Sequence, residues 1–213
     1  MLIGYHGTTT PKAKNILESG RFLDSKGDRH WLGNGVYFFA EELHAYLWNR
    51  NQFKNKTKCF DTKELLDQYE ILCAEIQNER NFDLDIAEYK LIFEEAYRKA
   101  VVMLAGASSP NRNICAEGVI LNLMFTRMGF DNDFDLVTAT FQVKIKRYDS
   151  MPLSSRLRGI PQRQICVKNC SIISKVTPDD ISLRITDLEK KASIIDSPIS
   201  WNYDSGHRTH YNT

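Results

Sequence analysis

The sequence of 213 residues contains no apolar run long enough to span a lipid bilayer. Its first residues, Met-Leu-Ile-Gly-Tyr-His, also lack the basic region and the long apolar segment of a secretory signal peptide. Both absences argue against a membrane protein and against a secreted precursor. We therefore expect a cytoplasmic protein that makes no membrane contact.

The sequence lacks a pattern of cysteines that would suggest a disulfide framework. The five cysteines are an odd number, and they are scattered at Cys59, Cys73, Cys115, Cys166 and Cys170. This pattern fits a reducing compartment. The last two are four residues apart, but no second cysteine pair or nearby histidine accompanies them, so we predict no metal site.

Net charge and repetition are also nearly absent. The formal net charge is +1, so the molecule as a whole gives no electrostatic argument for binding nucleic acid, although a local basic face remains open. The sequence has no internal repeat, heptad run, low-complexity segment or obvious linker. We therefore expect one domain, with residues 1–176 as its catalytic part and residues 177–213 as a C-terminal extension or tail.

Hydrophobic periodicity and turn residues predict an α+β fold. We expect a split, bent, antiparallel-rich sheet that is flanked by helices. The expected strands are residues 2–5, 36–39, 69–76, 137–145 and 162–170, with residues 171–176 extending or pairing with the last one. The expected helices are residues 10–20, 41–53, 85–104, 117–128 and 187–193. Residues 51–58 and 150–161 are expected to form loops.

The segment from Trp31 to Phe39 is the most informative part of the chain. It reads Trp-Leu-Gly-Asn-Gly-Val-Tyr-Phe-Phe, so two glycines at positions 33 and 35 precede a run that favours a strand. Glycine lets another group approach the backbone closely. A turn that a ligand can approach therefore leads directly into a strand that carries Tyr37.

Two further segments complete a pattern. Tyr5-His6-Gly7-Thr8 follows the first expected strand, and Gln162-Arg163-Gln164-Ile165-Cys166-Val167 follows the expected loop at 150–161. Together with the Gly-Asn-Gly-Val-Tyr-Phe segment, this resembles the ADP-ribosyltransferase family, in its diphtheria-toxin and poly-ADP-ribose-polymerase-like branch. That branch carries a histidine, a tyrosine and a glutamate on three strands. The resemblance covers residues 1 to about 176, by element order only in the middle.

The resemblance implies roles for residues that bind NAD. His6 would hydrogen-bond the adenosine ribose, Gly7 would hold the nicotinamide amide through its backbone, and Thr8 would assist on the adenosine side. Tyr37 would stack on the nicotinamide ring, with Gly35 beside it in the turn. A second aromatic side chain from the next helix often completes the stack in this family, and either Tyr46 or Trp48 would serve.

The third segment departs from the family at its central residue. Gln164 stands where the family has its glutamate, and a glutamine can accept a hydrogen bond but cannot take a proton or carry a charge. Glu75 or Glu117 would be the replacement acid if one exists. By resemblance, Gln162 would select the acceptor, and the arginines of the 150–161 loop, Arg156 among them, would meet phosphate.

The resemblance thus implies an NAD-dependent mono-ADP-ribosyltransferase that acts on RNA, DNA or protein, with nucleic acid slightly favoured. It would be a toxin of a toxin–antitoxin or phage-defence module, with an antitoxin protein as partner. Two alternatives stay open. One is a non-catalytic module that binds NAD or ADP-ribose, and the other is an NAD glycohydrolase that releases ADP-ribose into water.

Overall fold

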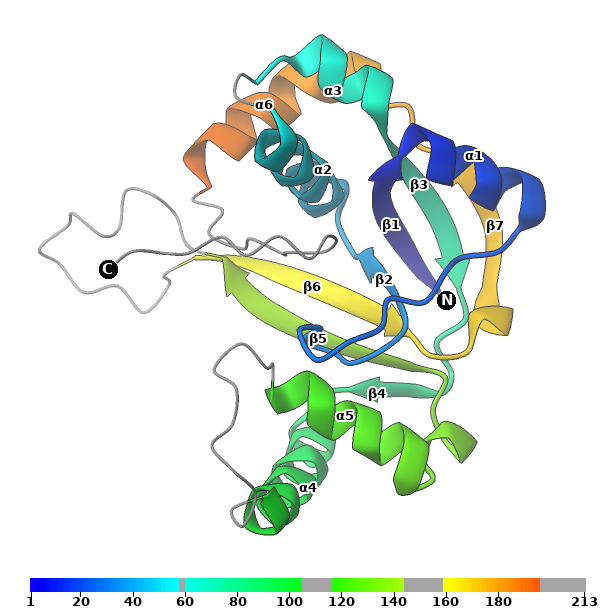
Figure 1. Cartoon of the computed structure of the whole chain (residues 1–213), viewed down its shortest axis with the longest axis vertical. Helices are drawn as coiled ribbons and strands as arrows, with labels where there is room; N and C mark the ends of the chain where they lie inside the picture. Colours follow the sequence, from blue (N-terminus) through cyan, green and yellow to red (C-terminus); the bar gives the residue numbers. More distant parts are fainter. Residues whose placement is uncertain (58–59, 105–115, 144–158, 196–213) are drawn as a thin grey trace, which may run out of the picture.

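The computed structural model of the chain describes residues 1–57, 60–104, 116–143 and 159–195. Their strands form one seven-stranded sheet in the spatial order β4-β5-β6-β2-β1-β3-β7 (Figure 1). The strands are β1 (Leu2–Thr9), β2 (Val36–Phe39), β3 (Tyr69–Ile76), β4 (Asn81–Asp83), β5 (Leu136–Val143), β6 (Ile160–Val167) and β7 (Ile173–Pro178). All neighbouring strands pair antiparallel except β4 and β5, which are parallel. The predicted α+β fold with an antiparallel-rich sheet is confirmed.

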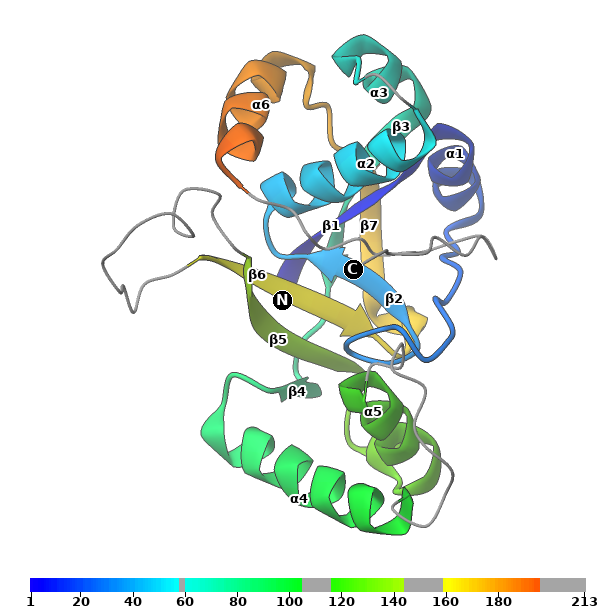
Figure 2. The same cartoon turned by 60° about the vertical axis from the view of Figure 1, so that its left-hand side comes forward.

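Helices lie in separate groups around the sheet. They are α1 (Thr10–Ser19), α2 (Glu42–Lys56), α3 (Thr62–Gln68), α4 (Ala87–Leu104), α5 (Ala116–Arg127) and α6 (Ile185–Ile194). In both ribbon views α2, α3 and α6 gather at one end of the molecule, whereas α4 and α5 lie at the other end beside β4 and β5 (Figures 1 and 2). Among the described residues, no helix has the length and apolarity needed to cross a membrane.

The sheet is bent and nearly divided in its middle. β1 is paired with β3 along its whole length, from Leu2 opposite Ile76 to Thr9 opposite Tyr69. In contrast, β1 and β2 share the single register pair Tyr5 opposite Phe39. In Figure 1, the group β1-β3-β7 runs steeply across the direction of β5 and β6. Two halves of one sheet therefore meet at a short contact, and this contact positions the candidate site.

Three apolar clusters form the core of the described residues, and the first two of them join the two halves of the sheet. One packs Phe39 and Ile71 against α2 and α6, and a second packs α1 against Phe38 and Leu72. The third packs α4 and α5 against Phe82 and Val137. Because β2 contributes Phe39 to the first cluster and Phe38 to the second, this four-residue strand is buried from both faces.

The turn residues explain where most elements end, but several predicted boundaries are wrong. Gly20 ends α1 as predicted, with φ 66° and its N–H bonded to the Ile16 carbonyl at 2.8 Å. β1 continues through Thr9 instead of ending at Tyr5, so the His-Gly-Thr segment is part of a strand. Residues 51–56 belong to α2 and not to a loop.

Two elements were not predicted, and one pairing differs from expectation. The short elements α3 and β4 carry no strong periodic signal within seven and three residues. The segment at 171–176 neither extends nor pairs with β6, because β7 lies on the far edge of the sheet against β3. Proximity in sequence suggested the wrong neighbour, and the intervening turn Cys170–Ile172 redirects the chain.

Much of the predicted C-terminal extension is packed into the core. Ile181, Leu188, Ala192 and Ile195 are buried in the cluster beneath α2. The Tyr46 hydroxyl of α2 also donates a hydrogen bond to Glu189 of α6. Residues 179–195 thus complete the same domain as residues 1–176. Residues 196–213 lie outside the described part of the chain.

Candidate functional site

The division between β1 and β2 leaves main-chain groups of Gly7 directed into the gap. Asp179 donates its N–H to the Ile71 carbonyl at 2.8 Å, so the main-chain groups of Ile71 point toward β7. Gly7 lies opposite Ile71. Because the main-chain groups of Ile71 point away from β1, Gly7 and Ile71 form a non-hydrogen-bonded pair of the antiparallel ladder. The N–H and C=O of Gly7 therefore point away from β3 and toward β2.

His6 prevents β2 from closing this edge. Continuing the register of Tyr5 and Phe39 by two residues would place Gly7 opposite Tyr37, where a ladder bond is expected. The His6 ring instead bonds the Tyr37 carbonyl oxygen through Nδ1 at 2.8 Å. The His6 side chain thus bonds the Tyr37 carbonyl oxygen that would otherwise accept a main-chain N–H of β1. Strands β1 and β2 diverge at that point.

The bond to Tyr37 fixes the chemistry of the imidazole. A carbonyl oxygen only accepts, so Nδ1 carries the hydrogen, and in the neutral ring Nε2 is a bare acceptor. Burial lowers the pKa of His6 below its ordinary value, so the ring is neutral at pH 7. The ring is wedged between Phe22 and Phe38, at centroid distances of 5.3 and 5.5 Å. The described residues form no hydrogen bond to Nε2.

Helix α2 crosses directly over Gly7. A Cβ atom at this position would lie 2.7 Å from Asn49 Oδ1 and 2.8 Å from the Ala45 carbonyl oxygen, so only glycine fits. Asn49 is 3% exposed, its Nδ2 donates to the Glu70 carbonyl at 3.0 Å, and its buried Oδ1 has no partner among the residues that the structure describes. A buried acceptor thus lies beside the glycine whose own polar groups face the gap.

Tyr37 is held by the turn that precedes it. Its hydroxyl donates to the Gly33 carbonyl at 2.6 Å and accepts from the Leu32 N–H at 3.0 Å. Lys168 fixes the same turn from β6, because its Nζ donates to the carbonyls of Leu32 and Asn34 at 2.6 Å each. The half-buried ring of Tyr37 is therefore rigidly placed.

The glycines of this turn are required by contacts within the protein. Gly33 has φ 75°, and a Cβ there would lie 2.4 Å from Asn122 Oδ1. Gly35 has φ 150°, and a Cβ there would lie 2.5 Å from the Val167 carbonyl oxygen. The close approach that the glycines allow is made by α5 and β6. The role of Gly35 in binding a cofactor stays a prediction.

Gln162 and Gln164 form a buried pair on β6. They are 4% and 1% exposed, and Gln164 Nε2 donates to Gln162 Oε1 at 2.9 Å. Gln164 Oε1 is buried, and none of the described residues forms a hydrogen bond to it. A buried acceptor without a donor is costly, at about 1–3 kcal/mol, which is typical of a position completed by a bound group or water.

The predicted triad does not share one face of the sheet. Gln164 lies opposite Phe39, and Tyr37 lies opposite Cys166 two pairs further along, so Tyr37 and Gln164 are diagonal neighbours on one face. Phe39 lies opposite Tyr5, which places the adjacent His6 side chain on the other face. The structure therefore places Tyr37 and Gln164 on one face of the sheet. His6 lies on the opposite face and contacts Tyr37 through the hydrogen bond to its main-chain carbonyl.

The remaining predicted residues occupy mixed positions. Thr8 is buried on the same face as His6, and Trp48 is half-buried on α2 against the core. Tyr46 is fully buried and bonded to Glu189, so of the two aromatic candidates Trp48 is the accessible one. Glu75 is paired with Lys175 toward the sheet edge, and Glu117 is in the first turn of α5. Arg156 lies outside the described residues.

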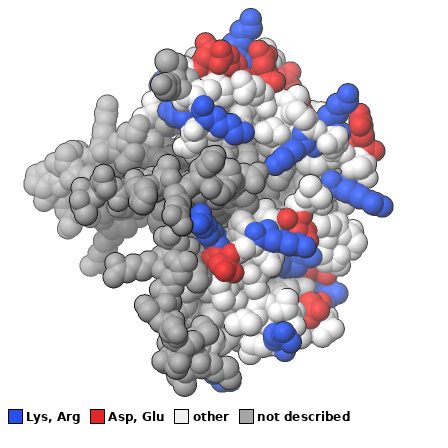
Figure 3. Space-filling view, in the orientation of Figure 1, with Lys and Arg blue, Asp and Glu red and all other residues white. Residues whose placement is uncertain are grey.

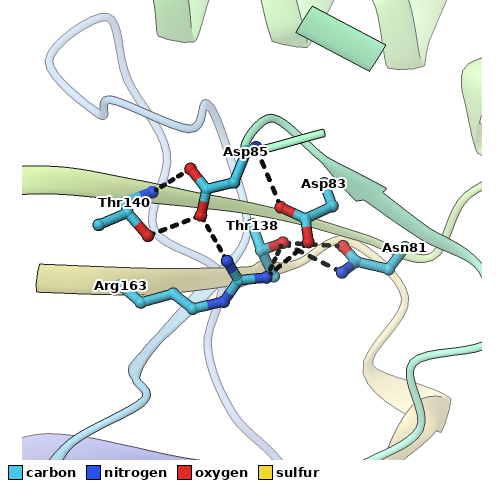
Figure 4. Close-up of polar contacts among 6 residues, drawn as sticks. All are labelled: Asn81, Asp83, Asp85, Thr138, Thr140 and Arg163. Atoms are coloured by element: carbon cyan, nitrogen blue, oxygen red, sulfur yellow. Dashed lines mark hydrogen bonds and ion pairs between the residues drawn. The ribbon is translucent and has the colours of Figure 1, made fainter. Parts of the chain in front are cut away.

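Arg163, between the two glutamines, points to the opposite face and anchors the strand. Its guanidinium bonds Asp83 at 2.7 Å, Thr138 at 3.1 Å, and Asp85 (Figure 4). Asp85 also accepts from the N–H and the hydroxyl of Thr140, at 3.0 and 2.6 Å. Because every member of this network has partners, we assign it to fixing β6 against β4 and β5.

Sequence patterns missed two polar residues of α2. His44 is 1% exposed, and within the described part of the chain neither of its ring nitrogens has a hydrogen-bond partner, while Asn49 carries the unpaired oxygen beside Gly7. The available signal was that these two polar residues lie in the same helix as the buried apolar residues Ala45 and Phe53. In the described ranges no group of three or more His, Cys, Asp or Glu residues is placed to hold a metal ion.

Comparison with known proteins gives two kinds of relative. The chain is 35% identical over 195 residues to the protein named "Uncharacterized protein MJ0359" of Methanocaldococcus jannaschii, which covers 85% of this chain and 88% of that protein. It is 26% identical over 162 residues to "Minor capsid protein M1249L" of African swine fever virus, which covers 74% of this chain but 11% of the viral protein. No protein-family model and no solved structure matches the chain.

Proposed function

This chain belongs to the same family as the archaeal protein MJ0359, and we propose that it is an NAD-dependent mono-ADP-ribosyltransferase. The observation that carries the proposal is the open edge at Gly7. A strand edge in the middle of a sheet, held apart by a neutral histidine, presents an N–H and a C=O to a ligand. A carboxamide such as that of nicotinamide complements this pair, because it both donates and accepts.

The surrounding residues fit the rest of the substrate. From the opposite face of the sheet, the bare Nε2 of His6 would accept from one ribose hydroxyl, while Gln164 Oε1, which has no partner among the described residues, would accept from another on the face of Tyr37. Tyr37 and Trp48 supply aromatic surface for a flat ring, with stacking worth about 1 kcal/mol beyond burial. These groups are uncharged hydrogen-bonding and aromatic groups, which suits the carboxamide, the rings and the ribose hydroxyls of NAD.

The reaction breaks the bond between nicotinamide and ribose and forms a bond from the ribose carbon to the acceptor. The acceptor gives up one proton, and nicotinamide leaves as a neutral molecule. The bond breaks through an oxocarbenium-like state, as in glycoside hydrolysis. Positioning and fixed dipoles supply the rate in such a site. Gln164 orients the ribose but takes no proton, so we propose single transfer and no chain elongation.

The acceptor and the cellular role are inferred from the same family resemblance. We propose a macromolecular acceptor, with nucleic acid favoured over protein, that meets Gln162 and the loop that contains Arg156. On the face in Figure 3, Lys and Arg side chains are interspersed with Asp and Glu over the described surface. Recognition there would depend on individual contacts and not on a large basic field. A toxin of this kind acts in the cytoplasm and requires a neutralising protein.

A second candidate function is favoured by Gln164. Replacing a carboxylate with an amide removes the charge that stabilises a developing cation, while it retains a hydrogen-bond acceptor. The same site would then bind NAD or ADP-ribose without turnover. Hydrolysis of NAD, with water as the acceptor, is the third outcome of the same chemistry.

One experiment separates these functions. The purified protein is incubated with NAD labelled in its adenine, together with RNA, DNA or a protein extract, and both macromolecular label and free nicotinamide are measured. We expect label on one acceptor class and an equal amount of nicotinamide, both lost in His6→Ala. Nicotinamide without label indicates the glycohydrolase. Neither product, despite NAD binding, indicates the binding module, and the absence of binding refutes the proposal.

A further inference from the structure

His44 and Gln164 are two buried side chains whose polar atoms lack partners on the same side of β2. His44 lies near the start of α2, and its ring centroid is 6.2 Å from that of Phe39. Gln164 lies directly opposite Phe39 in the register of β2 and β6. Both side chains therefore lie beside Phe39, His44 from α2 and Gln164 from β6. Helix α2 packs over β1 and β2 at this place (Figure 2).

Their hydrogen-bonding groups are complementary to one kind of ligand. The described residues give neither nitrogen of His44 a partner, and Gln164 Oε1 also has none. Burial lowers the pKa of His44 to about 4, so at pH 7 the ring is neutral, with one N–H donor and one bare nitrogen. Three polar atoms in an apolar cluster thus offer one donor and two acceptors, without a charge.

We propose that His44 and Gln164 together bind a neutral group that both donates and accepts hydrogen bonds, a hydroxyl or a primary amide. The group accepts from the His44 N–H and donates to Gln164 Oε1. A charged phosphate or carboxylate is disfavoured, because His44 and Gln164 are buried and neutral and would leave such a charge uncompensated. This inference rests on the proposed function, since NAD carries such groups at both ends, a carboxamide and ribose hydroxyls.

The physical test uses the cost of an unpaired polar group. If no ligand contacts His44, replacing it with an apolar ring of similar size removes unpaired nitrogens and leaves affinity unchanged. If a ligand contacts it, His44→Phe folds at least as stably as the wild type but binds more weakly. Stability and binding then change in opposite directions, which a residue with a purely structural role does not produce.

Tyr69→Phe is the matched control. The buried Tyr69 hydroxyl also lacks a partner among the described residues and belongs to the cluster beneath α2, but Tyr69 lies at the start of β3 opposite Thr9. Removing this hydroxyl deletes an unpaired polar atom away from Gln164. We expect Tyr69→Phe to retain wild-type affinity for every probe.

The experiment is calorimetric titration of the wild type and both variants with nicotinamide, with ADP-ribose and with NAD, each separately, alongside thermal unfolding. We expect His44→Phe to bind one probe at least tenfold more weakly without loss of stability. Weaker nicotinamide binding identifies the amide as the ligand group, and weaker ADP-ribose binding identifies a hydroxyl. If His44→Phe binds both probes with wild-type affinity, the proposed role of His44 is refuted, whereas the proposed function is not. A wild type that binds neither probe, nor NAD, refutes this site and the proposed function together.

Discussion

Replacing Gly118 with alanine tests the packing that positions the Tyr37 turn. Gly118 lies in the first turn of α5, and its backbone touches the His30 carbonyl. An added Cβ would lie 1.7 Å from that oxygen, whereas real Cβ contacts essentially never fall below 3.0 Å. The helix and the loop must therefore separate by at least 1.3 Å, the difference between these two distances.

Two effects of opposite sign compete in this variant. Alanine has the better helix propensity, by about 1 kcal/mol. Overpacking of a dense interior costs about 1–3 kcal/mol or more, and here the obstacle is a main-chain carbonyl that also accepts the Gly33 N–H at 3.1 Å. With the clash at about 3 kcal/mol, we expect Gly118→Ala to lose about 2 kcal/mol net.

Thermal unfolding followed by circular dichroism measures the outcome. A loss of about 2 kcal/mol corresponds to a melting temperature lower by roughly 4–8 °C in a domain of this size. Gly20→Ala is the control, because Gly20 has φ 66° but open space around it, so only the conformational cost of about 1 kcal/mol applies. A Gly118→Ala protein as stable as the wild type would contradict the contact between α5 and the loop.

Three other predictions concern burial and anchoring. The free energy of unfolding should fall by about 3 kcal/mol between pH 6.5 and pH 4 through His44, whose pKa is about 4 when folded, and His44→Phe should lack this part of the decline. The sign follows because the unfolded chain binds the proton first; an identical decline in a denaturant titration of both proteins would contradict it. Lys168→Met should cost about 1–3 kcal/mol, because it removes the ammonium donor from the carbonyls of Leu32 and Asn34 and leaves the latter only the weak Cys166 thiol, and chemical denaturation should detect this loss. Arg163→Lys should retain the charge but lose the paired geometry to its two aspartates, at about 1–2 kcal/mol, whereas equal stability would show that the network is not needed.

The sequence predicted the fold class and the longer elements because their signals are local. The alternation from Tyr69 to Ile76 gives β3 with the expected bounds, and glycine ends α1 where expected. The position of β7 was not predictable in this way, because its pairing with β3 depends on contacts about a hundred residues apart in the chain. Such pairings leave no periodic mark on the segment itself.

The candidate site was predictable in its residues but not in its arrangement. The motif segments named His6, Tyr37 and Gln164, yet only the register shows that His6 projects to the opposite face and bonds the Tyr37 carbonyl. His44 escaped notice because a polar residue in an amphipathic helix is ordinarily solvated. Its burial arises from α2 lying between the sheet and α6, which is a tertiary effect.

The central claim is that the edge of β1 at Gly7 binds NAD. Nitrogen-15 NMR of the wild-type protein during titration with NAD tests it most directly, since the Gly7 amide is a group that the ligand is proposed to contact. We predict a saturable shift of the Gly7 resonance together with changes at the His6 ring nitrogens, and no such shifts with inorganic phosphate. Resonances of Gly7 and His6 that stay unchanged at saturating NAD would contradict the account.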